Sequence, residues 1–379
     1  MPEFTIHRTD AFREDGRVLR YYDPVPAGGS PPVRGSATPD PAKVDPRGSE
    51  MRYNPLLDDY TVCAGFRMFR PLLPKSDDCP LCVGGFEAPE DYSVIAFDNR
   101  FPSLVLHPAP PNPGPEPPTE VLPGVGACEV VCYTPEHTLS LSDMPADQIL
   151  FLTHAWCDRY EELAGHDSIR AVMIFENRGE AVGVTLHHLH GQIYALSLVP
   201  PRILAEKRSA DRARADGRCV FCEVVAGERR SGARVLWESG RFLAAIPFFA
   251  RYPYEVHVYA KRHGCASMLE FDAEDKRELA GLLRFVAAKY DALFEAPMPY
   301  MMVFHQLHEE CEAYHFHVEF YPVRRSAAAL KYAASVETGA GLWLNDAYPE
   351  RTIEDLRDAG PAEPEFPAAA VSGITQVRR

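Results

Sequence analysis

Two histidines stand two residues apart in the segment 187–192, which reads His-His-Leu-His-Gly-Gln. The residues around them alternate as in a β-strand, so the side chains of His188 and His190 should point to the same face. One imidazole could then hold a metal ion while the other attacks a substrate. Neutral imidazole is nucleophilic near pH 7 and leaves easily once charged, which suits two-step group transfer. A pair at this spacing is equally compatible with a structural role.

The chain also contains two Cys-x-x-Cys pairs, Cys79/Cys82 and Cys219/Cys222. Thiolates at this spacing can share one zinc ion, and each pair would need two further ligands from elsewhere in the chain. In a long chain without an export signal, thiols or metal ligands are favoured over disulfides. The competing interpretation is a pair of buried thiols in a turn.

The composition bounds the class of protein. The chain has 379 residues, 46% of them hydrophobic, which is enough for one large or two ordinary domains. Its 39 Lys and Arg against 54 Asp and Glu give a net charge of −15, which argues against non-specific binding of nucleic acid. No apolar run approaches the ~20 residues that cross a bilayer, and the N-terminus lacks the pattern of a signal peptide. We therefore expect a cytoplasmic protein that binds neither nucleic acid nor membrane.

An internal repeat organises the chain between its two ends. Seven landmarks of the first half are Cys79-x-x-Cys82, Arg100-Phe101, Glu129, Tyr133, His137, Ile174-Phe175 and His188-x-His190. They recur in the second half as Cys219-x-x-Cys222, Arg241-Phe242, Glu255, Tyr259, His263, Val303-Phe304 and His315-x-His317. The spacing from His137 to His188 is 51 residues, and that from His263 to His315 is 52. This agreement indicates the duplication of one unit.

Each unit combines short strands with one long helix. We expect strands near residues 92–96, 128–133, 170–175 and 191–198, and helices over 146–163 and 273–294, with Asp143 and Asp272 as N-caps. Consecutive strands with few helices between them favour an α+β fold with a mainly antiparallel sheet. A short hairpin could form at 14–18, residues 23–50 read as an arm or linker, and the Ala- and Pro-rich end after residue 360 should fray.

The segment 188–192 resembles the His-Pro-His-Gly-Gln active-site motif of the galactose-1-phosphate uridylyltransferases, a branch of the histidine-triad superfamily. Leu189 stands where that family usually has Pro. Four further segments occur in the family's order, namely 52–56, 79–82, 99–102 and 315–322, so the resemblance covers roughly residues 50–350. It implies two fused histidine-triad-like units that pack as one body. The expected organisation is an arm (1–50), a first unit with the nucleophile (51–205), a second unit (206–350) and a tail (351–379).

The resemblance also implies an activity. His190 would attack the α-phosphorus of a UDP-hexose, release hexose 1-phosphate and form a uridylyl-histidine, and a second hexose 1-phosphate would then accept the uridylyl group. This is ping-pong chemistry. Gln192 would hydrogen-bond a phosphoryl oxygen as charge develops. His188 would brace the nucleophile two residues on.

The resemblance further implies metal sites. His137 and His188 match the family's remaining zinc ligands beside Cys79 and Cys82, and zinc there would steady His188. A second metal, zinc or iron, would use Glu206, His305, His317 and Glu319. The internal repeat offers a competing set for the second half, formed by Cys219, Cys222, His263 and His315. The sequence leaves open whether one or both second-half sets are filled.

Substrate-binding residues follow from the same resemblance. Arg67 and Arg70 match a phosphate-contacting arginine pair, and arginine's planar fork suits that task. Asn99 and Asn177 match nucleotide-binding positions, and Thr185 a hydroxyl near the phosphate. The residues that the family contributes to the hexose across a dimer interface are matched by Lys331, Tyr332 and Glu337, so we expect a homodimer with shared sites.

Other functions remain open from the sequence. A related nucleotidylyltransferase or phosphorylase would keep the histidine chemistry but act on a different nucleotide sugar or a dinucleotide. A paralogue that only binds nucleotide or metal is the main alternative outside the enzymes, and the intact His188, His190 and Gln192 argue against it. Leu189 and the unusual segment 306–311 bear on the choice of sugar more than on the chemistry.

Overall fold

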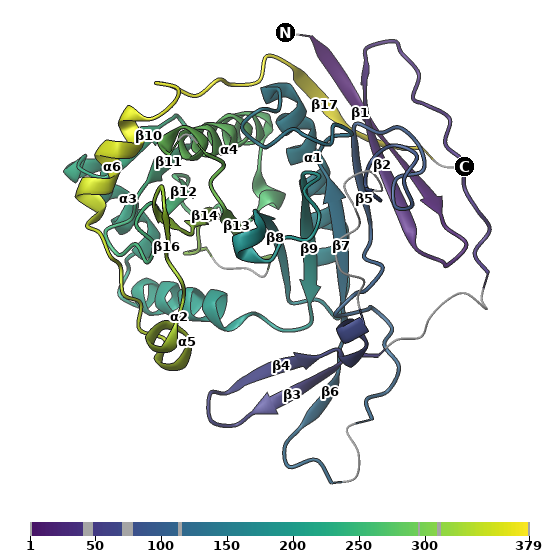
Figure 1. Ribbon diagram of the computed structural model, residues 1–379, viewed down its shortest axis with the longest axis horizontal. Coiled ribbons are helices and arrows are strands. Elements are labelled where there is room, and N and C mark those ends of the chain that lie inside the picture. Colours follow the sequence, from purple (N-terminus) through teal and green to yellow (C-terminus); the bar gives the residue numbers. More distant parts are fainter. Residues whose placement is uncertain are drawn as a thin grey trace.

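A large mixed sheet forms the centre of the molecule in the computed structural model, which describes residues 2–40, 48–69, 79–112, 116–294, 296–308 and 312–377 (Figure 1). In spatial order the sheet contains β10 (Val235–Glu238), β11 (Phe242–Ala245), β12 (Val256–Ala260), β14 (His317–Pro322), β13 (Tyr300–His305), β8 (Ala171–Arg178), β9 (His190–Leu196), β7 (Gly126–Cys132), β5 (Val94–Asp98), β2 (Val18–Pro26), β1 (Glu3–Phe12) and β17 (Ala370–Val377). Neighbouring strands are antiparallel except β1 and β17, which are parallel. The predicted α+β class with a mainly antiparallel sheet is confirmed.

The remaining elements surround this sheet. A small sheet of β4 (Asp59–Cys63), β3 (Glu50–Asn54) and β6 (Val121–Pro123) projects from it, and β15 (Arg324–Ser326) pairs with β16 (Ala329–Leu330). The shorter helices are α2 (Pro201–Ala215), α3 (Val220–Ser231), α5 (Ser335–Ala340) and α6 (Pro349–Asp358), with 3-10 turns η1 (Gly65–Phe69), η3 (Glu180–Val182) and η4 (Met268–Glu270). None of the helices in the described part of the chain is long and apolar enough to cross a membrane.

Two long helices, α1 (Ala146–Ala164) and α4 (Ala273–Leu293), pack together over one face of the sheet (Figure 1). The core lies between them and the strands. Trp156 of α1 is fully buried and meets Tyr133 edge-on at 5.4 Å and Phe304 of β13 at 5.0 Å between ring centroids. Large aromatic rings dominate the energetics of such a core. Because Phe304 belongs to the second half, one core joins the two halves.

The two halves meet at the pairing of β8 with β13, where Phe175 lies opposite Val303. The sheet therefore runs without a break through both units, as expected of halves that pack as one body. The boundaries predicted at residues 51, 206 and 351 stay predictions.

The helix starts test the predicted caps. Asp272 is the N-cap of α4, and its side chain accepts a hydrogen bond from the Asp275 backbone in a capping box. The prediction for Asp143 is wrong, because α1 begins after Pro145, which makes no side-chain cap. The carboxylate of Asp143 instead accepts hydrogen bonds from the backbone and hydroxyl of Ser140, at 3.1 and 2.6 Å.

The first and last strands of the described chain, β1 and β17, lie side by side. The hairpin expected at 14–18 forms, with long strands β1 and β2 joined by a turn in which Gly16 has φ +81. The expectation that the chain frays after residue 360 is wrong, because β17 pairs with β1 over Glu3–Thr9. The composition of this segment could not reveal a pairing partner at the other end of the sequence.

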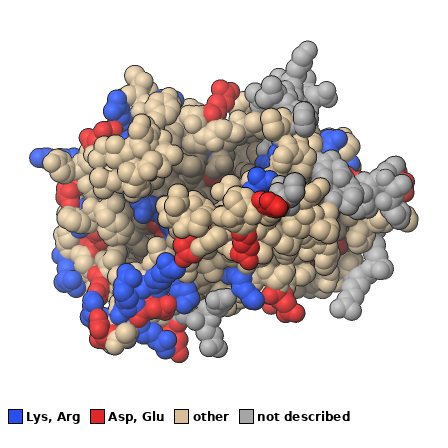
Figure 2. Space-filling view, turned by 90° about the horizontal axis from the view of Figure 1, so that it is seen from below, with Lys and Arg blue, Asp and Glu red and all other residues tan. Residues whose placement is uncertain are grey.

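The surface mixes charges of both signs. On the face shown in Figure 2, Lys and Arg side chains stand interspersed with Asp and Glu towards one end. Exposed pairs such as Lys207–Asp211 and Arg218–Glu223 bring opposite charges within 2.9 and 2.8 Å. Each such pair contributes little to stability.

Candidate active site

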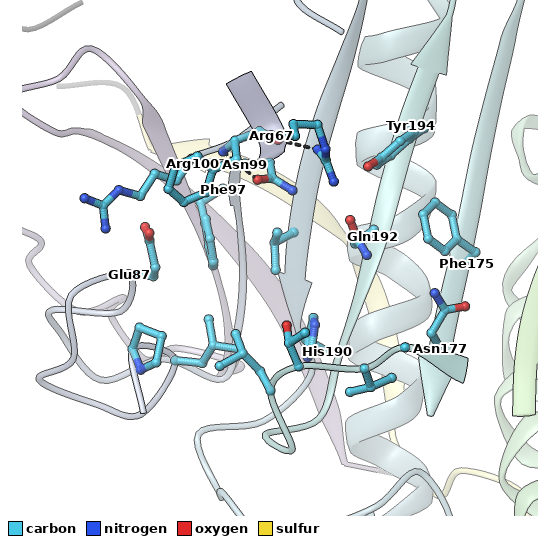
Figure 3. Close-up of a pocket in the computed structure, with 18 of the residues that line it drawn as sticks. Arg67, Glu87, Phe97, Asn99, Arg100, Phe175, Asn177, His190, Gln192 and Tyr194 are labelled. Carbon is cyan, nitrogen blue, oxygen red and sulfur yellow. Dashed lines mark hydrogen bonds between the residues drawn. The ribbon is translucent and has the colours of Figure 1, made fainter. Parts of the chain in front are cut away.

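A cavity of about 580 Å³ opens on the face of the sheet that α1 and α4 leave uncovered. One wall comes from β8 and β9, at the right of Figure 3, and the opposite wall comes from β5 and the segment after the first Cys pair, at the left. Alternation along β9 explains the facing, since Gly191, Ile193 and Ala195 are buried while the residues between them reach the cavity. The lining residues are Arg67, Pro80, Leu81, Phe86, Glu87, Phe97, Asn99, Arg100, Phe101, Val130, Phe175, Asn177, Gly183, Val184, Thr185, Leu186, His190, Gln192 and Tyr194.

His190 lies at the start of β9 in this wall. Its Nδ1 is 2.7 Å from the carbonyl oxygen of His188, and because a carbonyl can only accept, Nδ1 carries the hydrogen. The lone pair is therefore on Nε2. Burial lowers the pKa of His190, although the bond to the His188 carbonyl opposes this. A neutral imidazole with a free Nε2 is the nucleophilic form.

Gly191 is required by what lies behind the strand. A Cβ at this position would stand 2.0 Å from the hydroxyl of Tyr133 and 2.9 Å from the carbonyl oxygen of Phe175. Tyr133 is completely buried, so its ring cannot yield easily. The glycine of the motif thus lets the strand with His190 sit directly on Tyr133. Leu189, between the two histidines, packs in the core beneath β9.

Most of the predicted nucleotide-binding residues lie together in this cavity. Arg67, Asn99, Asn177 and Thr185 line it along with His190 and Gln192 (Figure 3). Arg67 donates a hydrogen bond to the carbonyl of Phe101. Asn99 accepts one from the Phe101 backbone at 2.8 Å, which fixes the loop after β5. Arg70 lies outside the described residues.

Three predicted residues lie elsewhere. Lys331, Tyr332 and Glu337 are not among the residues that line this cavity. Lys331 Nζ is paired with Glu337 Oε1 at 2.6 Å in a buried position, while Tyr332 is 69% exposed.

Several lining residues were missed from the sequence. Tyr194 could have been found, because it follows Gln192 by two residues on the same face of one strand. Glu87 and Phe86 carry no such signal, since they lie in an irregular segment after Cys82.

The first metal set forms as predicted from the Cys79 pair. Cys79, Cys82, His137 and His188 offer ligand atoms that all lie within 4.8 Å of one another. His188 Nδ1 is 3.8 and 3.5 Å from the sulfurs of Cys79 and Cys82. Its Nε2 donates to the Thr134 carbonyl at 2.8 Å, which leaves the Nδ1 lone pair facing the thiols. Two thiols and two imidazoles fit a tetrahedral zinc ion.

The competing second-half set forms as well. Cys219, Cys222, His263 and His315 also lie within 4.8 Å of one another. His315 Nε2 is 3.4 and 3.5 Å from the two sulfurs, and its Nδ1 donates to the Ala260 carbonyl at 3.0 Å. As in the first half, the set offers two thiols and two imidazoles. Here Nε2 of His315 faces the thiols, whereas in the first set Nδ1 of His188 does so.

The carboxylate set is a third, separate group. Glu206, His305, His317 and Glu319 lie within 4.8 Å of one another, and three of the four are buried. His305 Nδ1 is 3.0 Å from Glu206, and His317 Nε2 is 3.5 Å from Glu319. Burial alone would raise the pKa of Glu319, but His257, His305, His317 and Arg202 hold it well below its usual range. The described residues thus bring both second-half sets together, and the two sets share no residue.

The register of the strands relates the third set to the cavity. Gln192 lies opposite Phe175, and Glu319 lies opposite Val303 in the same way. Two residues further along, His305 lies opposite His317. Two residues beyond the pair Phe175–Gln192, by the same register, Asn177 lies opposite His190. His305, His317 and Glu319 therefore occupy, in the second unit, the positions of Asn177, His190 and Gln192, whereas the fourth residue, Glu206, comes from α2.

Comparisons with known proteins agree with this geometry. The family model for the N-terminal domain of galactose-1-phosphate uridyl transferase matches residues 43–200, and that for the C-terminal domain matches residues 206–338. A galactose-1-phosphate uridylyltransferase of Thermotoga maritima is 44% identical over 82% of this chain and 98% of its own length. One of Streptomyces lividans is 33% identical over 93% of this chain and 98% of its own. A solved uridylyltransferase structure has a TM-score of 0.73 at 32% identity, over 81% of this chain and 97% of that one.

Proposed function

The chain belongs to the galactose-1-phosphate uridylyltransferase family, and from this premise we propose that His190 carries the uridylyl group during transfer. The enzyme moves a uridylyl group between UDP-hexose and hexose 1-phosphate by a ping-pong mechanism. The observation that carries the role of His190 is its place on the cavity wall with Nδ1 bonded to the His188 carbonyl, which leaves the lone pair on Nε2.

The geometry supports two displacements at phosphorus. His190 Nε2 attacks the α-phosphorus of the UDP-hexose, an N–P bond forms, and the P–O bond to hexose 1-phosphate breaks. The ring becomes positively charged, and its Nδ1–H remains bonded to the His188 carbonyl at 2.7 Å, which stabilises that charge. A phosphate oxygen of the second hexose 1-phosphate then attacks the same phosphorus and releases neutral His190.

The neighbouring side chains supply charge and hydrogen bonds. The amide of Gln192, two residues along β9, can donate to a phosphoryl oxygen without fixing a full charge beside it. Arg67 gives the cavity a guanidinium for phosphate. Asn99 and Asn177 offer amides to the nucleotide, and Thr185 a hydroxyl.

The metal sets fit structural ions. We assign zinc to the set of Cys79, Cys82, His137 and His188, because two thiolates and two imidazoles suit it. The set of Cys219, Cys222, His263 and His315 suits zinc equally. The mixed carboxylate and imidazole set suits zinc or iron. An ion at the first set would hold His188, whose carbonyl orients the nucleophile.

The test of the nucleophile is a covalent adduct. Wild-type protein incubated with UDP-glucose and no acceptor should gain one uridylyl mass per chain, and His190→Gly should gain none and lose transfer. The matched control is His187→Gly, which removes an imidazole that is 62% exposed and should leave the adduct intact. Full turnover by His190→Gly would refute the assignment of His190 as the nucleophile. Repeating the incubation with other nucleotide sugars would show the base and sugar preference.

A homodimer with shared sites is the second part of the proposal. Lys331, Tyr332 and Glu337 lie away from their own cavity, and the same segment exposes apolar side chains, including Tyr332, Leu342 and Leu344. Exposed apolar groups gathered in one segment suit a protein interface.

Subunit mixing tests the shared site. Inactive His190→Gly chains exchanged with inactive Glu337→Ala chains should regain part of the activity, because one site of each mixed dimer carries neither change. Glu337→Gln controls for the loss of the side chain itself. No recovery after confirmed exchange of two dead parents would place each site within one chain.

A further inference from the structure

The β1–β2 hairpin stands outside both family models, which begin at residue 43 and end at residue 338. In the large sheet, β2 and β1 of the hairpin follow β5, the strand that contributes to one wall of the cavity. β2 pairs with β5 over four residues, with Leu19 opposite Phe97, and β5 leads directly into Asn99. Without β2, the outer edge of β5 would have unpaired backbone groups. The hairpin therefore supports the wall on which Phe97 and Asn99 stand.

Arg17, at the turn of this hairpin, reaches the wall itself. Its guanidinium is 2.7 Å from Glu87 Oε2 and 3.3 Å from the carbonyl oxygen of Asp98, and its Nε is 2.8 Å from Asp15. The Arg17 and Glu87 side chains are only 12% and 10% exposed. Glu87 lines the cavity, across from the wall of β8 and β9 (Figure 3). A partly buried ion pair of this kind orders a side chain more firmly than an exposed one.

The same turn also holds an aromatic ring of the wall. Two guanidinium groups lie over the ring of Phe86, that of Arg13 at 4.4 Å and that of Arg100 at 4.6 Å from the ring centroid. Arg13 belongs to the hairpin, whereas Phe86 and Arg100 line the cavity. Cations over a ring face attract it. Adjacent residues of the wall are thus both fixed by the hairpin.

The hairpin is firmly anchored away from the cavity. Arg8 of β1 forms ion pairs with Asp10, Asp158 and Glu162, the last two on α1, and β17 covers the outer edge of β1. The strands that carry the turn with Arg17 are therefore fixed to the body of the protein by contacts outside the turn itself.

We propose that the β1–β2 hairpin is a positioning element of the cavity, in which Arg17 holds Glu87 so that its carboxylate accepts a hydrogen bond from a hydroxyl group of the nucleotide sugar. A carboxylate repels phosphate and accepts from hydroxyl groups, so Glu87 suits a sugar ring of the ligand. Oε2 is bound to Arg17, and Oε1 has no hydrogen-bond partner among the residues that the structure describes, so we assign it to the ligand. The inference rests on the proposed function for the identity of the ligand, and Arg17 is a positioning residue because it acts through Glu87.

The experiment measures adduct formation against UDP-glucose concentration in the absence of acceptor. Arg17→Met should raise the half-saturating concentration about tenfold, the size expected when a hydrogen bond to a charged group is lost, with little change in the maximal rate. Glu87→Ala should do the same, and Arg17→Met/Glu87→Ala should be no worse than Glu87→Ala alone. Arg17→Lys should recover part of the affinity.

The control is Arg8→Met, which breaks ion pairs of the same hairpin far from Glu87. It should lower the melting temperature and leave the half-saturating concentration unchanged. Equal effects of Arg8→Met and Arg17→Met on saturation, or additive effects in the double variant, would overturn the proposal. The same variants are titrated with UDP-glucose by calorimetry, so that a wild type without adduct would contradict only the role of His190.

Discussion

Gly191→Ala should slow uridylyl transfer strongly while leaving the chain folded. The added Cβ would lie 2.0 Å from the Tyr133 hydroxyl, 2.9 Å from Cζ of the same ring and 2.9 Å from the carbonyl oxygen of Phe175. Ordinary contact begins at 3.4 Å, so the hydroxyl and the new methyl group must separate by 3.4 minus 2.0, or 1.4 Å. Tyr133 packs edge-on against Trp156 in the closed core, and the Phe175 carbonyl belongs to the sheet. The strand that carries His190 must therefore move.

The magnitude follows from that displacement. A misplacement of about 1 Å at a reacting group costs roughly 100-fold in rate, and overpacking a core costs about 1–3 kcal/mol of stability. We expect adduct formation to slow by about that factor, with a lower melting temperature but a cooperative transition. Tyr133→Phe removes the nearest atom, so Gly191→Ala/Tyr133→Phe should recover about tenfold of the lost rate, since Cζ remains close.

The assay is single-turnover adduct formation with saturating UDP-glucose, read by intact mass. Gly227→Ala is the matched control, because a Cβ there meets only the tip of Arg230 at 4.0 Å on helix α3; its rate should equal that of the wild type. A wild-type rate of adduct formation in Gly191→Ala, or no recovery of that rate in the double variant, would refute the argument that Tyr133 holds β9 in place through Gly191.

Two further predictions follow from the metal sets and from a buried carboxyl group. Cys79→Ser, Cys219→Ser and His317→Ala should each lower the metal content by about one ion per chain, measured by elemental analysis, since each belongs to a different set. Burial raises the pKa of Glu176 to about 7, so the folded state binds a proton that the unfolded chain has lost between pH ~4.5 and 7. Its contribution to stability is thus present below pH ~4.5 and lost as the pH rises through 7. The free energy of unfolding of Glu176→Gln should therefore rise relative to that of the wild type by up to ~3 kcal/mol between pH 5 and pH 8. A difference between the two proteins that does not change with pH would contradict this prediction.

Local pattern was enough to predict much of the fold and site. Alternation placed His188 and His190 on one face, and Leu189 indeed packs on the other side in the core. Asp272 was predictable as a cap because a cap depends on its immediate neighbours. The prediction of Asp143 as an N-cap failed because α1 begins only after Pro145 and the Asp143 carboxylate bonds to Ser140 instead.

Contacts between distant segments could not be predicted in this way. The pairing of β17 with β1 joins the two ends of the sequence, and neither strand carries a signal for the other. The fit of Gly191 on Tyr133 likewise needs the register of β7 with β9. Spacing alone also could not show that His315 and His317, two residues apart, each lie in a complete and separate cluster of possible ligands.

The two units place different side chains at equivalent register positions of one scaffold. Burial lowers the pKa of His190, whose wall neighbour is the neutral Gln192. Burial would lower the pKa of His317 as well, but Glu319 and Glu206 outweigh it and raise it. A carboxylate at the position of Gln192 would repel the phosphate that the first unit must accept, while it binds a cation well. The side chain at this register position therefore suits phosphate in the first unit and a cation in the second.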